Sequence, residues 1–407
     1  MQRTFILSFI ALILVAIVAF FVFVFVPGTS EPQGDTGGNQ GLFGSLFPFN
    51  SGGGDRVPAE GGPGDSGDEL VDTRPVPDLR QVTETPSSGG FFYENEADET
   101  VIRFIERRTG HVYDTPAEGR SVVRISNTTI PGIQEVLFAN KDAFIIRSLD
   151  KDGAWENFYA TLEGDTAEQS LSGSFLAGWE RGVLDAAGEN LLTVNEGVDG
   201  SSVVLSGSDG SGARRVLSSP VVSWIPLQSD DNLYVYTAPS SGIPGFLYRV
   251  VSGALRRVAG DVPGMMALVS PSGRYVLLST GPASGEPALI LLDTETGEES
   301  ASPLGTLASK CVFLSESPVR AVCGVPQEFP EGAYPDDWLR GTVSFDDDIW
   351  LVEPERGTAT LLALPDEDVG VAIDAWRPFV SESGAYVGFL NKKDLSLWSL
   401  RLQEEVF

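Results

Sequence analysis

The chain has 407 residues, with 57 acidic and 27 basic side chains and a formal net charge of −30. This charge argues against a nucleic-acid binder, because phosphate contacts need a basic surface. One histidine and two cysteines leave too few ligands for a zinc site of the usual four, and the length predicts several segments or a repeat architecture.

The chain opens with an almost unbroken apolar run, Phe5–Val26, which is long enough to span a bilayer. Arg3 precedes this run and Glu31 follows it, a charge order that places the N-terminus in the cytoplasm. The competing interpretation is a cleaved signal peptide, but the bulky end Phe20–Val26 disfavours cleavage. We predict that residues 1–26 are a transmembrane signal anchor. The protein is then a single-pass protein of the cytoplasmic membrane, with the rest of the chain in the periplasm or at the cell surface.

A Gly- and Pro-rich segment, residues 27–95, comes next and shows no helical or strand period. Such a composition predicts a disordered linker. One apolar island, between Leu42 and Phe49, either docks on a membrane surface or partner or is a few apolar residues in a tether. Of the net charge, −7 falls in residues 27–90 and +1 in the first 26 residues, which leaves −24 for the rest.

The head, residues 96–407, consists of short β-branched and aromatic runs separated by turn residues, a pattern typical of strands. The clearest unit runs from Met265–Val269 through the turn Ser270–Gly273 to two further strands, Arg274–Ser279 and Ala288–Asp293. Equivalent points recur about every 40–45 residues, which is the period of a four-stranded propeller blade. We therefore predict an all-β propeller of six blades, or of seven if the start of the head forms a blade of its own.

A propeller must also close its ring so that no long strand edge stays open. The runs Val101–Glu106 and His111–Asp114 lie outside the other predicted blades. We expect these two runs to complete the last blade and to pair the first strands of the head with the last.

The turn Ser270-Pro271-Ser272-Gly273, followed by Arg274-Tyr275-Val276, resembles the repeats of TolB-like and WD40-like (PD40) propellers. Their pattern has Asp where this turn has Ser272. The stretches Ile125–Gly132 and Tyr334–Trp338 are similar to those of membrane-anchored propeller proteins of unknown function from small uncultured bacteria. The resemblance implies the fold and leaves the function open, because propellers host many functions.

The two cysteines, Cys311 and Cys323, fall on neighbouring predicted strands on either side of a turn at Ser315–Pro318. If the strands pair there, the two residues lie opposite each other, close enough to form a disulfide, and the predicted compartment permits one. The alternative is a pair of buried free thiols.

Acidic residues are dense in one insertion of the head, at Asp336, Asp337, Asp346, Asp347 and Asp348. Clustered carboxylates outside the cell are a usual source of calcium ligands, so these residues are candidates for a calcium site. The alternative is a solvated loop. No other cofactor is expected.

No catalytic residue is predicted. The Gly-x-Ser-x-Gly motif of hydrolases is absent, and the single histidine, His111, is expected to be structural or exposed. Abundant acids leave a carbohydrate-active hydrolase or lyase with paired carboxylates as an alternative. Three aromatic residues in the insertion, Tyr334, Trp338 and Phe345, are candidates for a binding face.

The predicted function is therefore that of a non-enzymatic binding or scaffold module. Residues 5–26 would hold it to the membrane. One end of its central channel, or the insertion, would bind a protein, a peptide or an envelope component, because loops on a rigid scaffold are where binding residues lie. The alternative remains a carbohydrate-active enzyme that acts through carboxylates on one propeller face.

Overall fold

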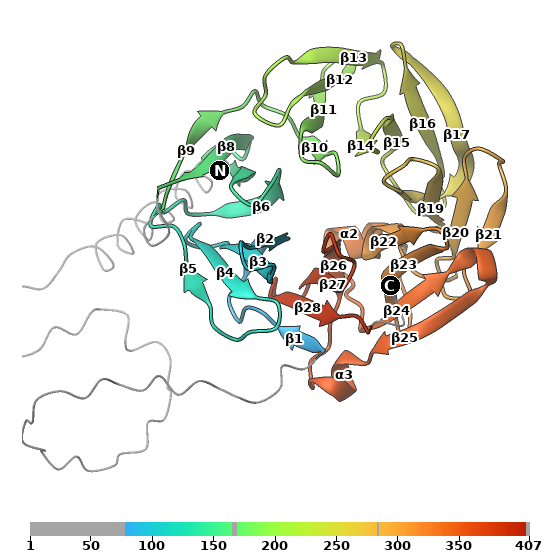
Figure 1. Cartoon of the computed structure of the whole chain (residues 1–407). Coiled ribbons are helices and arrows are strands. Elements are labelled where there is room, and N and C mark those ends of the chain that lie inside the picture. Colours follow the sequence, from blue (N-terminus) through green and yellow to red (C-terminus); the bar gives the residue numbers. More distant parts are fainter. Residues whose placement is uncertain (1–77, 165–168, 283–284, 404–407) are drawn as a thin grey trace, which may run out of the picture. The chain divides into compact units, whose positions relative to one another are not determined.

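The short strands of the head form seven four-stranded antiparallel sheets around a ring in a computed structural model, which describes residues 78–164, 169–282 and 285–403 (Figure 1). The fold is a β-propeller, and of the two predicted blade numbers the structure has seven. The predicted anchor and the apolar island lie outside the described residues. Among the described residues, no helix has the length and apolar character needed to cross a membrane.

The first three blades use consecutive strands, numbered outward from the channel. Blade 1 has β2 (Ser87–Glu94), β3 (Thr100–Glu106), β4 (Val112–Pro116) and β5 (Val123–Arg124). Blade 2 has β6 (Ile133–Phe138), β7 (Ala143–Leu149), β8 (Trp155–Glu163) and β9 (Ser170–Phe175). Blade 3 has β10 (Arg181–Leu184), β11 (Asn190–Gly197), β12 (Gly200–Gly207) and β13 (Arg214–Ser219).

Blades 4 to 6 repeat the same order. Blade 4 has β14 (Trp224–Gln228), β15 (Leu233–Thr237), β16 (Pro244–Val251) and β17 (Ala254–Pro263). Blade 5 has β18 (Met266–Val269), β19 (Tyr275–Ser279), β20 (Leu289–Asp293) and β21 (Glu299–Ala301). Blade 6 has β22 (Cys311–Glu316), β23 (Val319–Pro326), β24 (Asp347–Glu353) and β25 (Thr358–Ala363).

Blade 7 combines the two ends of the propeller. It has β26 (Ala375–Val380), β27 (Tyr386–Asn391) and β28 (Leu397–Arg401), with β1 (Leu79–Gln81) as its fourth strand. In the described part of the chain, four short helices lie between strands, namely η1 (Ala308–Lys310), α2 (Asp336–Arg340), η2 (Pro354–Arg356) and α3 (Pro365–Asp368).

The turn at Ser270 shows why the repeat has its sequence. The Ser270 hydroxyl accepts a hydrogen bond from the backbone N–H of Tyr275, and Gly273 adopts a φ of +78°, which an L side chain rarely tolerates. Blade 7 repeats this arrangement, with Ser381 accepting from the N–H of Tyr386. These turns close the hairpins between the first and second strands of their blades.

The core lies between the blades. Each of the seven buried apolar clusters among the described residues unites side chains of two neighbouring blades. Blades 7 and 1, for example, meet through Leu390 and Leu397 on one side and Phe92 and Phe104 on the other. Every blade therefore buries both faces against a neighbour, and the closed ring leaves no blade face open.

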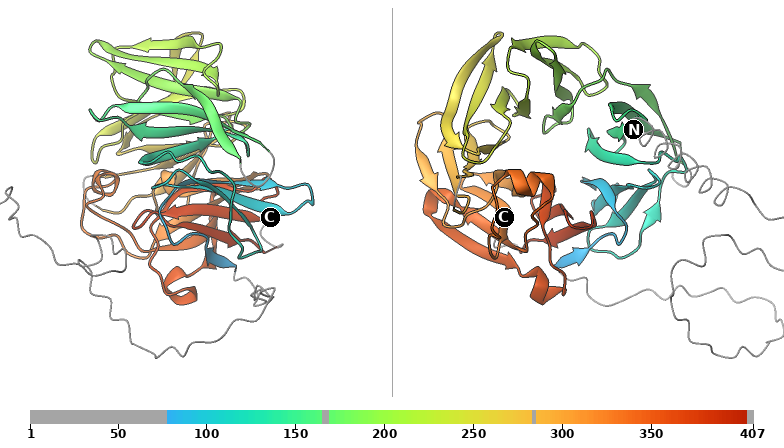
Figure 2. Two further views of the ribbon diagram at one scale, coloured as in Figure 1. Left: turned by 90° about the vertical axis from the view of Figure 1, so that its left-hand side faces the viewer. Right: turned by 180° about the vertical axis from the view of Figure 1, so that it is seen from behind.

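Closure differs from the prediction. The runs at residues 101–106 and 111–114 belong to β3 and β4 of blade 1 rather than to the last blade. The ring is closed by β1, which pairs with β28 through Leu79 opposite Leu400 and Gln81 opposite Trp398 (Figure 2). Leu79 is buried in the cluster between blades 6 and 7, and this burial explains why so short a strand is held there.

The boundary of the propeller therefore also needs correction. Residues 27–95 were expected to form a linker, yet the whole of β1 and of β2 falls in this range. The Gly89-Gly90 pair lies inside β2, and a Cβ on Gly90 would come within 2.7 Å of the Phe379 ring. Glycine is needed at that position because blade 7 packs close to the backbone.

Candidate functional site

The strand directions define two ends of the ring. At one end, the first strand of every blade begins and a loop connects the second strand to the third. We call this end the insertion face. The insertion itself, residues 327–346, joins β23 to β24 on this face and contains α2.

The three aromatic residues predicted to form a binding face are instead buried. Tyr334 is 2% exposed, Trp338 is 1% exposed and Phe345 is not exposed at all. They pack on one another and join the apolar cluster between blades 5 and 6. These side chains hold the insertion in place, so that prediction is wrong.

A buried charged cluster anchors the insertion beneath these rings. The Lys310 ammonium lies 2.7 Å from the Asp347 carboxylate and also pairs with Asp374. Asp374 further accepts hydrogen bonds from the Trp338 indole at 3.0 Å and from the Phe345 N–H at 3.1 Å. The cluster joins η1 and β24 to the start of blade 7.

The two carboxylates of this cluster titrate in opposite directions. Burial raises the pKa of Asp347 to about 6, and the pairing with Lys310 offsets this only in part. Burial also tends to raise the pKa of Asp374, but Lys310 and the donated hydrogen bonds hold it below its ordinary value. Asp374 is therefore the carboxylate that balances Lys310.

The acidic residues proposed for calcium are not brought together. Asp336 accepts from the Ser241 N–H, Asp337 accepts from the Ala333 N–H at 2.8 Å, and Asp346 pairs with Lys393. Asp348 accepts from Gln327, and Asp347 belongs to the buried cluster. Within the part of the chain that the structure describes, no group of three or more His, Cys, Asp or Glu residues could hold a metal ion.

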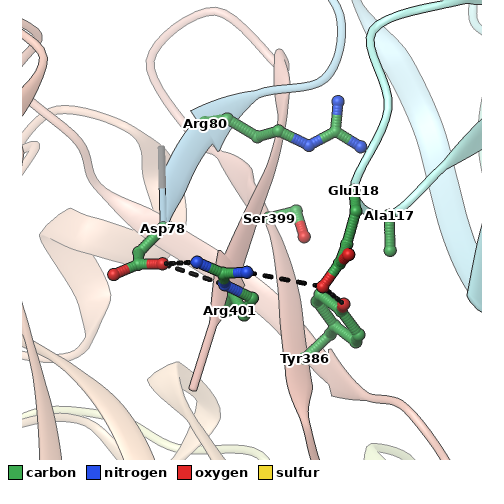
Figure 3. A pocket seen from close by; sticks show the side chains of 7 residues that line it. All are labelled: Asp78, Arg80, Ala117, Glu118, Tyr386, Ser399 and Arg401. Atoms are coloured by element: carbon green, nitrogen blue, oxygen red, sulfur yellow. Dashed lines mark hydrogen bonds and ion pairs between the residues drawn. The ribbon is translucent and has the colours of Figure 1, made fainter. Parts of the chain in front are cut away.

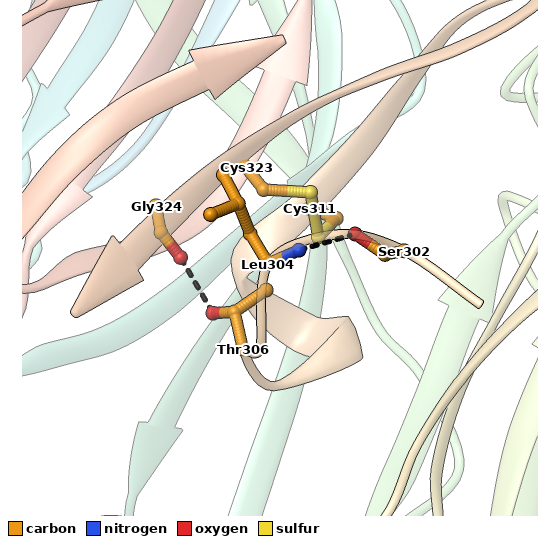
Figure 4. Close-up of a disulfide and its surroundings, with 6 residues drawn as sticks. All are labelled: Ser302, Leu304, Thr306, Cys311, Cys323 and Gly324. Atoms are coloured by element: carbon orange, nitrogen blue, oxygen red, sulfur yellow. Dashed lines mark hydrogen bonds between the residues drawn. A yellow bond between two sulfur atoms is a disulfide. The ribbon is translucent and has the colours of Figure 1, made fainter. Parts of the chain in front are cut away.

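The predicted disulfide is present. Cys311 pairs opposite Cys323 in the β22–β23 register, with Cα atoms 4.1 Å apart, and the two are bonded (Figure 4). Both are buried, and the Thr306 hydroxyl donates to the carbonyl of neighbouring Gly324 at 2.6 Å. The bridge lies just before the insertion and fixes its base to the inner strand of blade 6.

A small cavity of about 10 Å³ lies where β1 closes the ring. Arg401 pairs with Asp78 at 2.8 Å and with Glu118 of blade 1 at 3.4 Å, and Tyr386 donates to Glu118 at 2.9 Å (Figure 3). Its volume is about that of one water molecule. This ion-pair network therefore occupies the seam between blades 7 and 1 and leaves no room for a ligand.

A larger pocket, of about 430 Å³, opens at the insertion face inside the ring. Its walls come from the first strands of four blades, β6, β10, β14 and β26, which surround the centre of the ring in Figure 1. We call this pocket the channel mouth. It is lined by Arg107, Gln134, Glu135, Arg147, Trp155, Glu180, Arg181, Gly182, Ile225, Pro226, Trp376 and Arg377.

Arg147 forms the rigid floor of the channel mouth. Its guanidinium lies 4.2 Å from the ring centres of both Trp155 and Trp179, an arrangement that favours a cation. It pairs with Glu135 and donates to the side-chain oxygen of Asn157 at 3.0 Å and to the Glu180 carbonyl at 2.7 Å. With its donors used in this way, Arg147 holds Glu135 in place.

Two further arginines face the same pocket. Arg377 pairs with Glu135 at 2.6 Å and stacks 4.3 Å from the ring centre of Trp376, with a φ of +51° that is unusual for arginine. Arg107 donates to the neutral side-chain oxygen of Gln134. Burial and the neighbouring charge of Arg377 lower the pKa of Arg107.

The sequence predicted binding at one end of the central channel or at the insertion, but it did not identify the residues of the channel mouth, because they are far apart in the chain. A signal was nevertheless present, since Arg181 and Arg377 each stand at the start of the first strand of a blade. Aligning the blades by these starts would have brought charged residues from several repeats together at one end of the channel.

No family model and no curated protein matches the sequence. Among solved structures, an oligogalacturonate lyase in complex with manganese is similar at 12% identity and a TM-score of 0.48, over 79% of this chain and 98% of that one. The β-propeller domain of the Trilobed protease from Pyrococcus furiosus shows 12% identity and a TM-score of 0.47, over 76% and 95%. TolB from Acinetobacter baumannii shows 10% identity and a TM-score of 0.43, over 77% and 79%. The propeller fold that the turns indicated is established by the seven four-stranded sheets of the structure itself.

Proposed function

We propose that this chain is a non-enzymatic binding module that captures a protein or peptide partner at the channel mouth. The observation that carries the proposal is the pocket of about 430 Å³ with walls from four blades. Ligand sites are typically preformed and concave, with a few placed polar groups. In this proposal, residues 5–26 hold the head outside the cytoplasmic membrane.

The charged side chains of the channel mouth are held in place before any ligand binds. Its carboxylate Glu135 is shared by two guanidinium groups, and Arg147 is fixed between two indole rings. Such preorganisation reduces the ordering cost of association. The buried insertion braces the same face, because Asp336 of α2 binds the loop of blade 4 at Ser240 and Ser241.

The alternative, a carbohydrate-active hydrolase or lyase, would have to use Glu135 and Glu180, the two carboxylates that line the channel mouth. A catalytic carboxylate must have an oxygen within hydrogen-bond reach of the reacting group, but Glu135 is already paired with the guanidinium groups of Arg147 and Arg377. We therefore favour binding. Polysaccharide cleavage that disappears in an E135Q variant would reverse this choice.

Photo-crosslinking tests the proposal in cells. A photoreactive amino acid placed at Ile225, which lines the channel mouth, should give a reproducible covalent adduct with one partner. The matched control places it at Val123, which is 53% exposed on the outermost strand of blade 1. Identical adducts at the two positions, or none at Ile225, would count against a binding role for the mouth.

A further inference from the structure

The charge of the channel mouth is opposite to that of the head. Four arginines and two glutamates line the pocket, whereas residues 91–407 together carry a net charge of −24. A local excess of positive charge on a strongly acidic protein attracts anions to that place and repels them elsewhere. The contrast therefore marks the mouth as a site for a negatively charged group.

The internal ion pairs do not use up this positive charge. Glu135 is shared between Arg147 and Arg377, and Arg181 pairs with Glu196. Arg107 donates only to the amide oxygen of Gln134, so among the described residues it has no carboxylate partner. A guanidinium carries five N–H donors, which leaves Arg107 and Arg377 with donors for a further acceptor.

We infer that the ligand of the channel mouth is an acidic peptide segment, whose carboxylate is bound by Arg107 and Arg377. This inference rests on the proposed binding function and names its ligand class. Guanidinium groups bind carboxylates through two parallel N–H donors. The apolar side chains of Ile225 and Pro226, which line the same pocket, suit the aliphatic part of such a segment.

The aromatic residues of the mouth favour a peptide over an acidic sugar. A sugar ring binds best on an open indole face, but Arg377 stacks on Trp376 and Arg147 stacks on Trp155. Each ring thus already has a guanidinium on one face. A carboxylate that approaches the edges of the arginines needs no open aromatic face.

Fluorescence anisotropy with the full-length chain in a nonionic detergent tests the inference. The probe is a labelled hexaglutamate peptide, and the matched neutral probe is hexaglutamine. We expect saturable binding of hexaglutamate only, with an affinity that falls as salt is raised. Equal binding of the two peptides, or no binding of hexaglutamate, would overturn the inference, and preferential binding of a uronic acid oligosaccharide would replace the peptide with a sugar.

Variants locate the site. R107Q should weaken hexaglutamate binding about tenfold or more, the scale expected for one charge-assisted hydrogen bond, and R107K should restore part of the loss by keeping the charge. R256Q removes an exposed arginine on β17 and should leave binding unchanged. An unchanged melting temperature of R107Q would show that the variant is folded and that only its binding is lost. Equal losses of hexaglutamate affinity in R107Q and R256Q would mean that the attraction is nonspecific.

The two proposals can fail separately. A crosslinked partner at Ile225 without hexaglutamate binding would keep the binding function and refute the acidic ligand. Hexaglutamate binding that depends on Arg107, without any crosslinked partner in cells, would keep the ligand class and refute the cellular function.

Discussion

The buried carboxylate of Asp347 predicts an unusual dependence of stability on pH. The substitution Asp347→Asn removes its ionisation while keeping its shape. Burial raises the pKa of Asp347 from 3.8 to about 6, so the folded protein holds this proton more tightly than the unfolded chain. The resulting stability is present below about pH 4 and is lost as the pH rises through about 6.

The magnitude follows from the shift. One pKa unit corresponds to about 1.4 kcal/mol, so the full effect is about 3 kcal/mol. Roughly half of it falls between pH 5 and pH 8, a range that avoids the low solubility expected near the isoelectric point of about 4.2. The stability of D347N relative to the unchanged protein should therefore rise by about 1–2 kcal/mol between pH 5 and pH 8.

Urea unfolding at the two pH values measures this difference. The Oδ1 atom of Asp347 is buried and has no hydrogen-bond partner, so the new amide group of D347N could carry a cost of its own. That cost does not change with pH, and comparing the same variant at both pH values cancels it. The matched control is D348N, one residue further along β24, where the side chain is only partly buried. A difference for D347N that stays constant with pH, or that matches D348N, would refute the reasoning.

Two further predictions concern the disulfide of blade 6 and the strand that closes the ring. Replacing Cys311 and Cys323 by alanine should lower the free energy of unfolding by about 3 kcal/mol, as measured by urea unfolding under non-reducing conditions; an unchanged midpoint would mean that the bridge adds no stability. Leu79→Ala should cost about 2–5 kcal/mol because Leu79 is buried between blades, whereas Arg401→Ala should cost less than about 1 kcal/mol because its ion pairs are exposed. Equal costs for the last two would contradict the assignment of closure to packing.

The sequence predicts the blades well because each blade is a local unit. The turn at Ser270–Gly273 and its copy at Ser381–Gly384 join strands that pair within a few residues of each other. The closing strand is different, since Leu79 pairs with Leu400. A three-residue strand has no measurable period, and its partner lies at the other end of the chain, so local patterning cannot reveal it.

The candidate site was predicted less well for a related reason. Trp338 lies beside several aspartates in the chain, and this composition is typical of an exposed loop. Its burial depends on Lys310 and Asp374, which come from other elements and supply the charges that the insertion packs against. The disulfide was predicted because Cys311 and Cys323 belong to one hairpin, where register follows from the turn.

The closing strand also has a mechanical consequence. The chain enters the propeller at Asp78 and runs directly into β1, whose pairing with β28 consists of three residue pairs. A pulling force that arrives through the preceding residues loads these pairs before it reaches any inner strand. If those residues hold the head to a membrane, as we propose, the pairing of β1 with β28 is the first contact of the propeller to break under force. Its rupture would open the ring from the outside while the six other blades still had all their strands.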